Sequence, residues 1–222
     1  MPEYLPSNVN PALLSDEGYM ETEEVLDDMI AELESVYGQA YDELNDKAKH
    51  YLAWFVTMDT AKRKLFEEGK LSAEEYQNWR RTNLMTGQHH FSMLQNMADY
   101  LTNVNGIAAS LINGYMPEVY AINGNYITYM VEQNFGINVM FDLVDEQTVE
   151  RLIKKKPDLL PKAAINIPKD LRWNKEHLNS AILQGILQGE TVDQIAARLA
   201  SVSDMSKNSA LRNAKTMTTS AQ

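Results

Sequence analysis

The stretch of sequence that decides the fold is residues 22–67, TEEVLDDMIAELESVYGQAYDELNDKAKHYLAWFVTMDTAKRKLFE. Its apolar side chains recur at steps of three and four, which places them on one stripe of an α-helix. The stripe consists of Leu26, Ile30, Leu33, Tyr37, Ala40, Leu44, Ala48, Tyr51, Phe55, Met58 and Leu65. At a rise of about 1.5 Å per residue this helix would be about 65 Å long. Because a helix of this kind gains most of its stability from packing, we expect a partner helix to cover the stripe.

The residues that follow predict such a partner. Gly69 lies where a helix would stop. Ser72 and Glu75 have the spacing of a capping box, so a second helix should begin there and run antiparallel to the first. Helical spacing continues through Tyr76, Trp79, Leu94, Met97, Leu101, Val104, Ala108 and Leu111. The sequence therefore predicts a long antiparallel helical hairpin.

Beyond the hairpin, prolines and glycines divide the chain. Pro117 is expected in the first turn of another helix, which reaches about Asn134 and ends at Gly136. Residues 137–144 could form a short strand or a buried connection. Asp145 can cap a short helix through Lys156.

The C-terminal part should form a separate small helical block. We expect a helix from about Trp173 to Gln188, stopped by Gly189 with a positive φ. Thr191 and Gln194 form a second capping box, and a last helix takes residues 205–222. The fold class is mainly α, with little or no β. The expected divisions are an extended arm (1–20), a long-helix region (21–156), a proline-containing linker (157–169) and the C-terminal block (170–222).

The charges are distributed as a gradient along the chain. The net charge is -11, and residues 1–50 already carry 13 acidic and 2 basic residues, whereas residues 151–222 carry 6 acidic and 12 basic ones. This gradient fits either two solvated faces of opposite sign or two ends that bind different partners.

The chain has no cysteine, which excludes disulfides, thiolate zinc sites and cysteine nucleophiles. No apolar stretch approaches the ~20 residues of a membrane span, and no secretory signal is readable, so we expect a protein made in the cytoplasm with no membrane partner.

Motifs for catalysis are missing from the sequence. It contains no phosphate-binding glycine loop, no nucleophile elbow and no zinc-protease helix motif. His89 and His90 are adjacent, so they point in different directions on a helix, and neither has a carboxylate four residues away. We therefore expect neither an enzyme nor a bound metal or cofactor.

One segment offers an alternative function. Residues 181–202, AILQGILQGETVDQIAARLASV, have the appearance of two helices of a helix-turn-helix module. The recognition helix would then be residues 205–222, with Lys207, Arg212 and Lys215 available for phosphate contacts. This interpretation predicts a DNA-binding regulator.

The same C-terminal block, residues 170–222, resembles the conserved segment of tailed-bacteriophage minor head proteins, the Mu F-type head-morphogenesis family. The residues that carry the resemblance are Trp173, Asn174, Gly185, Gly189, Ile195, Ala196, Leu199, Arg212, Ala214, Thr216, Thr219, Ala221 and Gln222. Two features depart from the family pattern. The family commonly has an acidic residue where this chain has Met217, and it usually continues past Gln222 with an asparagine and a glycine-arginine pair, which fits a truncated or processed form.

The resemblance implies a structural minor head (capsid) protein that binds at the portal vertex and acts in head assembly, DNA retention or genome delivery. Its implied partners are the phage portal protein, the major capsid or scaffold protein, and packaged double-stranded DNA through non-specific contacts. It also implies several copies around the vertex, a location in the virion, and a stay in the host cytoplasm during assembly.

Overall fold

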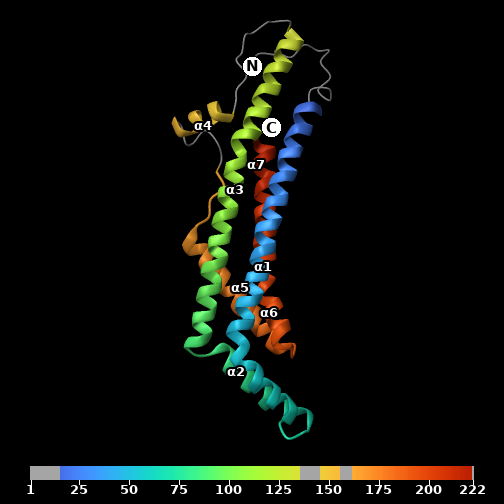
Figure 1. Ribbon diagram of the computed structural model, residues 1–222, viewed down its shortest axis with the longest axis vertical. Coiled ribbons are helices and arrows are strands. Elements are labelled where there is room, and N and C mark those ends of the chain that lie inside the picture. The colour runs from blue at the N-terminus through green and yellow to red at the C-terminus, as the bar shows by residue number, and fades with distance from the viewer. Residues whose placement is uncertain (1–15, 136–145, 156–161, 222) are drawn as a thin grey trace, which may run out of the picture. The chain divides into compact units, whose positions relative to one another are not determined.

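A computed structural model describes residues 16–135, 146–155 and 162–221, and throughout these residues the regular structure is α-helical (Figure 1). The helices follow one another as α1 (Asp16–Glu67), α2 (Ala73–Met85), α3 (Gln88–Phe135), α4 (Glu146–Lys155), α5 (Ile167–Leu187), α6 (Val192–Ala200) and α7 (Val202–Ala221). The predicted fold class is confirmed: long paired helices precede a smaller helical C-terminal part.

The described residues form two compact units. Unit 1 contains residues 16–33, 109–135, 146–155, 162–163 and 211–221, and unit 2 contains residues 34–108 and 164–210. The helices α1, α3 and α7 each contribute residues to both units.

Within unit 2, α1 and α3 run antiparallel. The Tyr37 hydroxyl donates a hydrogen bond to Oδ1 of Asn105 at 3.0 Å, and further along α1 the main-chain oxygen of Tyr51 lies 2.7 Å from Nε2 of His89. Residue numbers thus rise along α1 as they fall along α3. The hairpin interior is filled by fully buried side chains, namely Leu44, Ala48, Leu52, Phe55, Met93, Met97, Ala98 and Leu101.

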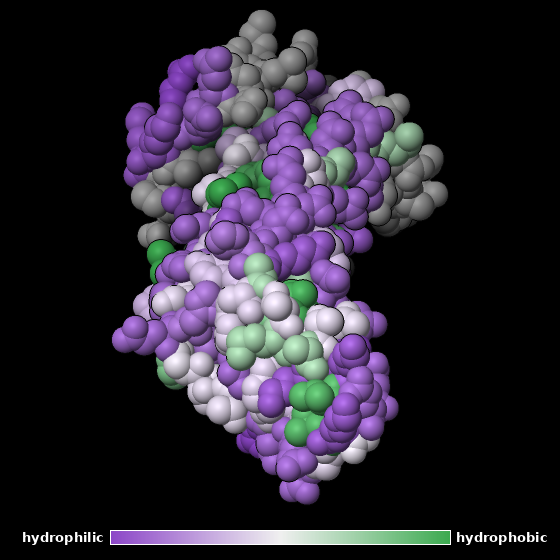
Figure 2. All heavy atoms as spheres, turned by 60° about the horizontal axis from the view of Figure 1, so that its bottom comes forward, coloured by the Kyte–Doolittle hydropathy of each residue, from purple (hydrophilic) through white to green (hydrophobic). Residues whose placement is uncertain are grey.

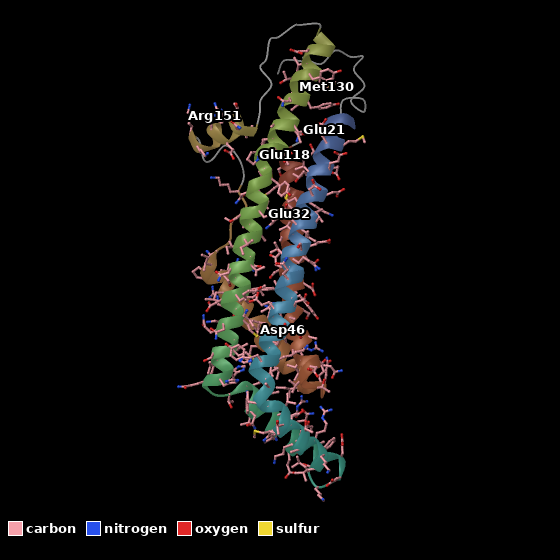
Figure 3. All side chains as sticks on the ribbon, viewed as in Figure 1. Glu21, Glu32, Asp46, Glu118, Met130 and Arg151 are labelled. Carbon is pink, nitrogen blue, oxygen red and sulfur yellow. The ribbon has the colours of Figure 1, made fainter. Side chains whose placement is uncertain are left out.

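Within unit 1, α1 and α3 are also antiparallel, since Glu32 of α1 interacts with Tyr115 of α3 and Thr22 with Asn123. Nδ2 of Asn123 in α3 donates to the Thr22 hydroxyl of α1 at 3.2 Å. On α4, Val149 is buried and clusters with Ala121 of α3. Between residues 20 and 46, most of the exposed side chains of α1 are acidic, as Glu21, Glu32 and Asp46 illustrate (Figure 3).

The expectation that a new helix begins at Pro117 is wrong, because α3 passes through this proline without a break. An interior proline removes one main-chain hydrogen bond and costs about 3 kcal/mol. Here Pro117 is buried between Met116 and Val119, which are 2% and 0% exposed. Burial of this apolar side of α3 in unit 1 therefore offsets the lost hydrogen bond.

The predicted connection between the first two helices is confirmed. Gly69 has φ +69°, and the main-chain amides of Gly69 and Lys70 bond to the carbonyls of Phe66 and Leu65, which closes the end of α1. Ser72 and Glu75 then form the predicted capping box of α2. The second helix expected from Ser72 onward is instead divided at Gly87 (φ +93°), because α2 ends at Met85 and α3 begins at Gln88.

Three helices begin earlier than the sequence predicts. Helix α7 starts at Val202 rather than at residue 205. Helix α1 starts at Asp16, so the last residues of the expected arm are helical. Helix α5 starts at Ile167 rather than near Trp173, because Asn166 caps it and Pro168 fits its first turn. The other arm residues, residues 137–144, the Asp145 cap and residues 157–161 of the expected linker lie outside the described residues.

The apolar stripe of α1 is buried only as far as Phe55. Met58 and Leu65, predicted to continue it, are 44% and 38% exposed. The inward face of α1 continues instead with Asp59, which is 5% exposed and accepts a 2.8 Å hydrogen bond from the Tyr76 hydroxyl of α2. A polar contact with α2 therefore replaces the expected apolar one.

Candidate interaction site

The turn between α5 and α6 is built on two glycines. Gly189 has φ +70°, as predicted, and its amide bonds to the carbonyl of Ile186, while the amide of Glu190 bonds to the carbonyl of Gly185. These two bonds close the end of α5 as a Schellman motif. Thr191 and Gln194 form the predicted capping box that starts α6.

Gly185 lets α5 and α6 approach closely. A Cβ atom at this position would lie 2.8 Å from Cγ1 of Ile195 and 2.9 Å from Oε2 of Glu190. Ile195, Ala196 and Leu199 of α6 are each 0% exposed. The resemblance residues of α5 and α6 thus form the interior of this helix pair.

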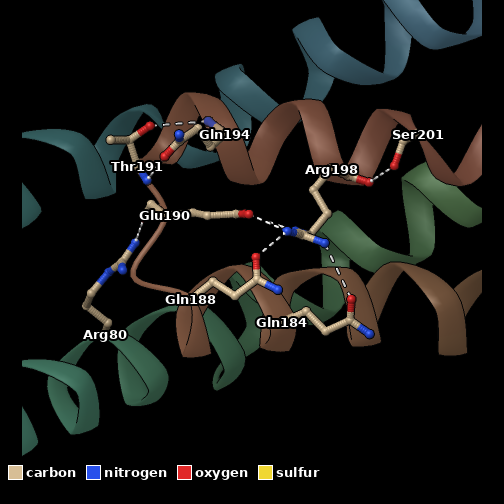
Figure 4. A network of polar contacts seen from close by, with 8 residues as sticks. All are labelled: Arg80, Gln184, Gln188, Glu190, Thr191, Gln194, Arg198 and Ser201. Carbon is tan, nitrogen blue, oxygen red and sulfur yellow. Dashed lines mark hydrogen bonds and ion pairs between the residues drawn. The ribbon is translucent and has the colours of Figure 1, made fainter.

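A set of polar contacts, which we call the turn network, surrounds the same turn (Figure 4). Arg198 of α6 donates from both Nε and Nη2 to the Glu190 carboxylate, the Nε bond being 2.9 Å long. Nη2 of Arg198 also donates to Oε1 of Gln188 at 2.8 Å, and Nη1 to Oε1 of Gln184 at 3.4 Å. The hydrogen bonds from Arg198 lower the pKa of Glu190.

Arg80 of α2 completes the turn network from outside the C-terminal block. Its guanidinium is fully buried and donates to the main-chain carbonyl of Glu190. Nε of Arg80 lies 3.3 Å from Oδ1 of Asp59, so the buried positive charge has a carboxylate partner in α1. The guanidinium also sits 5.7 Å from the ring centre of Tyr76. The turn is thus held by charged groups from α1, α2 and α6.

A second set of contacts, the Asn174 network, joins α5 to α1 and α3 in unit 2. Asn174 is fully buried and donates to Oγ1 of Thr102 at 2.9 Å and to Oδ2 of Asp170 at 3.1 Å. Asp170 accepts from Nδ2 of Asn105, whose Oδ1 accepts from Tyr37. Burial raises the pKa of the Tyr37 hydroxyl, and the charge of Asp170 raises it further.

The ten predicted site residues fall into two groups. Seven lie in unit 2. Of these, Trp173 is half-buried, and its ring stacks on that of His177 with the ring centres 3.7 Å apart. The other six have the roles given above, namely Asn174, Gly185, Gly189, Ile195, Ala196 and Leu199. Arg212, Thr216 and Thr219 belong to unit 1 and are exposed on α7. The first group is therefore structural, and the second lies on a surface.

Sequence reasoning missed the charged residues of the turn network. Arg80 occupies the buried row of α2 with Tyr76 and Leu84. A charged residue at a position where the helical spacing predicts an apolar one is the signal in the sequence that could have identified it. The partners of Arg80, Asp59 and Glu190, lie far from it in the sequence, and local spacing does not identify them.

The described residues show no ready-made metal site or membrane span. No group of three or more potential ligands gathers among them. His89 faces Tyr51, and His90 is buried, which lowers its pKa. No helix in the described part of the chain is long and apolar enough to cross a bilayer.

Comparison with models of protein families, with curated proteins and with solved structures gave no match.

Proposed function

We propose that this chain is a structural minor head protein of a tailed phage, which binds the portal protein at the vertex and does not act as an enzyme. The resemblance over residues 170–222 is the source of this assignment. The observation that carries it is the role of the resemblance residues in unit 2: Asn174, Gly185 and Gly189 hold helices together, and none of the three is arranged for chemistry.

The surface of the chain supports a role in assembly. Large apolar side chains are exposed at many places on the helices, and Figure 2 shows apolar patches within a mostly hydrophilic surface. Exposed apolar residues that gather in patches are typical of sites for protein partners. As part of the same proposal, the chain is located in the virion. There it contacts capsid or scaffold protein, packaged DNA and further copies of itself at the vertex.

The DNA-binding alternative has less support. Helices α6 and α7 are separated by Ser201 alone, whereas a helix-turn-helix module joins its helices by about three to four residues. The α5–α6 turn is long enough, but it would make α6 the recognition helix, and Arg198 of α6 is already bound to Glu190.

The test is incorporation into heads. The full chain should co-sediment with the portal protein encoded in the same phage genome. Gly189→Ala should reduce its incorporation, because alanine is strained at φ +70°. Gly38→Ala is the matched control, since Gly38 lies in α1 with open space around it. Trp173→Ala should reduce incorporation more than Phe91→Ala, because Trp173 belongs to the resemblance block and Phe91 is an exposed aromatic residue of α3 outside it. Failure of the intact chain to bind portal protein, or sequence-selective binding to duplex DNA, would contradict the proposal.

A further inference from the structure

Helix α7 buries few large apolar side chains. The buried positions among residues 202–220 are Val202, Ser203, Ser206, Ala210, Ala214, Met217 and Thr218. Three of these side chains carry a hydroxyl group and two are alanines, whereas the largest fully buried side chains of the described residues belong to α1, α2, α3 and α5. Hydrophobic stabilisation is roughly proportional to the apolar area removed from water. The contacts of α7 therefore stabilise it less than those of α1, α3 and α5.

The sequence of α7 also favours the helical state only weakly. Nine of its 20 residues are Ser, Thr or Asn, against five of the 52 residues of α1. Side chains of these three types have low helix propensity, because most of them form hydrogen bonds with the backbone that compete with the helix. A helix of this length and composition is at best marginal in water when it is isolated. We therefore expect α7 to be helical only while it is packed.

A buried hydroxyl group weakens the packing of α7 further. Thr218 is 1% exposed, and its Oγ1 has no hydrogen-bond partner within the described part of the chain. A buried polar group without a partner costs free energy, which the group regains when it meets water. By contrast, the buried hydroxyl of Ser203 donates to the carbonyl of Ala200 at 2.7 Å, next to the junction with α6. The start of α7 is thus held by a hydrogen bond that the buried hydroxyl near its end lacks.

These three features all favour opening of the same helix. We propose that α7 is a releasable helix, which unfolds and leaves its packed position as one unit while α1, α3 and α5 keep their structure. The released residues would stay solvated, because residues 205–221 contain three basic residues, no acidic residue and many hydroxyl and amide groups. The fold thus contains a segment with two states, packed and released. This inference does not depend on the phage assignment.

Hydrogen exchange of the full chain, followed by mass spectrometry, measures this opening. The amides of α7 should exchange as a group at least about tenfold faster than the slowest amides of α1, α3 and α5, because local opening has a smaller free energy than global unfolding. Phe55→Leu tests whether the two openings are separate, since the Phe55 ring stacks on Trp79 of α2 with ring centres 5.0 Å apart. This variant should speed the exchange of the slowest amides and leave the exchange of α7 unchanged.

Two matched threonine variants test the role of the buried hydroxyl. Thr218→Val removes the unpaired hydroxyl and keeps the shape of the side chain, so it should slow the exchange of α7 about tenfold. Thr216→Val makes the same change on the exposed side of α7 and should not slow the exchange. Circular dichroism should show all of these variants folded.

A second measurement uses the lack of cysteine in the chain. The variants Thr218→Cys and Ala98→Cys each introduce one thiol, the first in α7 and the second in α3, at positions that are 1% and 0% exposed. Labelling of the α7 thiol should depend little on urea below the unfolding transition, whereas labelling of the α3 thiol should accelerate steeply. The reason is that the urea dependence scales with the surface exposed on opening.

Four results would each overturn the proposal. The first is exchange of α7 at the rate of the slowest amides of α1 and α3. The second is equal acceleration of α7 and of those amides by Phe55→Leu. The others are equal effects of Thr218→Val and Thr216→Val on the exchange of α7, and equal urea dependence of the two thiols.

Discussion

The buried guanidinium of Arg80 donates a hydrogen bond to the main-chain carbonyl of Glu190, 110 residues further along the chain. The same guanidinium is paired with Asp59, 3.3 Å away. One side chain of α2 thus connects α1 with the α5–α6 turn. Because this charge is fully desolvated, its contribution depends on keeping its carboxylate partner.

Removal of Asp59 should destabilise unit 2 strongly. We expect Asp59→Ala to lower the free energy of unfolding by about 3–5 kcal/mol, because it leaves the Arg80 charge buried without a counterion. Urea unfolding followed by circular dichroism measures this loss. The double variant Asp59→Leu/Arg80→Met should be more stable than Asp59→Ala, since it removes both charges and keeps the volume. If the free energy of unfolding falls in the double variant by the sum of the losses in Asp59→Leu and Arg80→Met, the two side chains are not coupled.

Gly185 should not tolerate a methyl group. Gly185→Ala would place Cβ 2.8 Å from Ile195 and 2.9 Å from the Glu190 carboxylate, and overpacking of this kind costs about 1–3 kcal/mol. In Gly38→Ala, where nothing lies within 4 Å of the new Cβ, the change should stabilise the helix by about 0.5–1 kcal/mol. Urea midpoints of the two variants should therefore move in opposite directions. Equal shifts would show that the α5–α6 contact is looser than the structure has it.

Local signals in the sequence predicted most of the helices. Capping boxes at Ser72 and Thr191 and the stop at Gly189 act within a few residues, so they are legible without the fold. Pro117 misled the prediction because the packing that tolerates an interior proline comes from tertiary structure. The helix start at Ile167 was missed because a proline in a first turn looks, in sequence, like a proline in a linker.

The candidate site was less predictable than the fold. Gly185, Gly189 and Asn174 were singled out by resemblance, but the sequence did not indicate that Asn174 contacts Thr102 and Asp170. The partners of Arg80 were equally hidden, since each of these contacts joins segments distant in sequence. Spacing rules report which side chains share a face, and they do not report which faces meet.

The ion pair between Glu190 and Arg198 should make stability depend on pH. Hydrogen bonds from Arg198 lower the pKa of Glu190 in the folded chain. A carboxyl group of lowered pKa contributes stability at pH values above its unfolded pKa, and the contribution is lost as the pH falls through the folded pKa. The stability difference between the unaltered chain and Glu190→Gln should therefore be full at pH 7 and shrink below about pH 4.5.

Urea unfolding at pH 7, 5, 4 and 3 measures this difference. In an Arg198→Met background the same Glu190→Gln change should lose most of its pH dependence, because the donor that lowers the pKa is gone. A pH profile that is the same with and without Arg198 would assign the effect to other groups.

Asn174 should be replaceable by neither alanine nor aspartate. Asn174→Ala removes its bonds to Thr102 and Asp170 inside the core, at a cost of about 1–3 kcal/mol. Asn174→Asp keeps the shape but places a second carboxylate next to Asp170, and like charges at this distance raise the pKa of the pair. A raised pKa means that the folded state gains stability as the pH falls. The aspartate variant should therefore be less stable than the alanine variant at pH 7, and its stability should approach or exceed that of the alanine variant near pH 4.

Asn213→Asp on the exposed side of α7 is the control and should change stability by less than about 0.5 kcal/mol at pH 7. If Asn174→Asp and Asn174→Ala unfold at the same urea concentration at both pH values, residue 174 does not face Asp170, and the Asn174 network does not hold α5 in the way described.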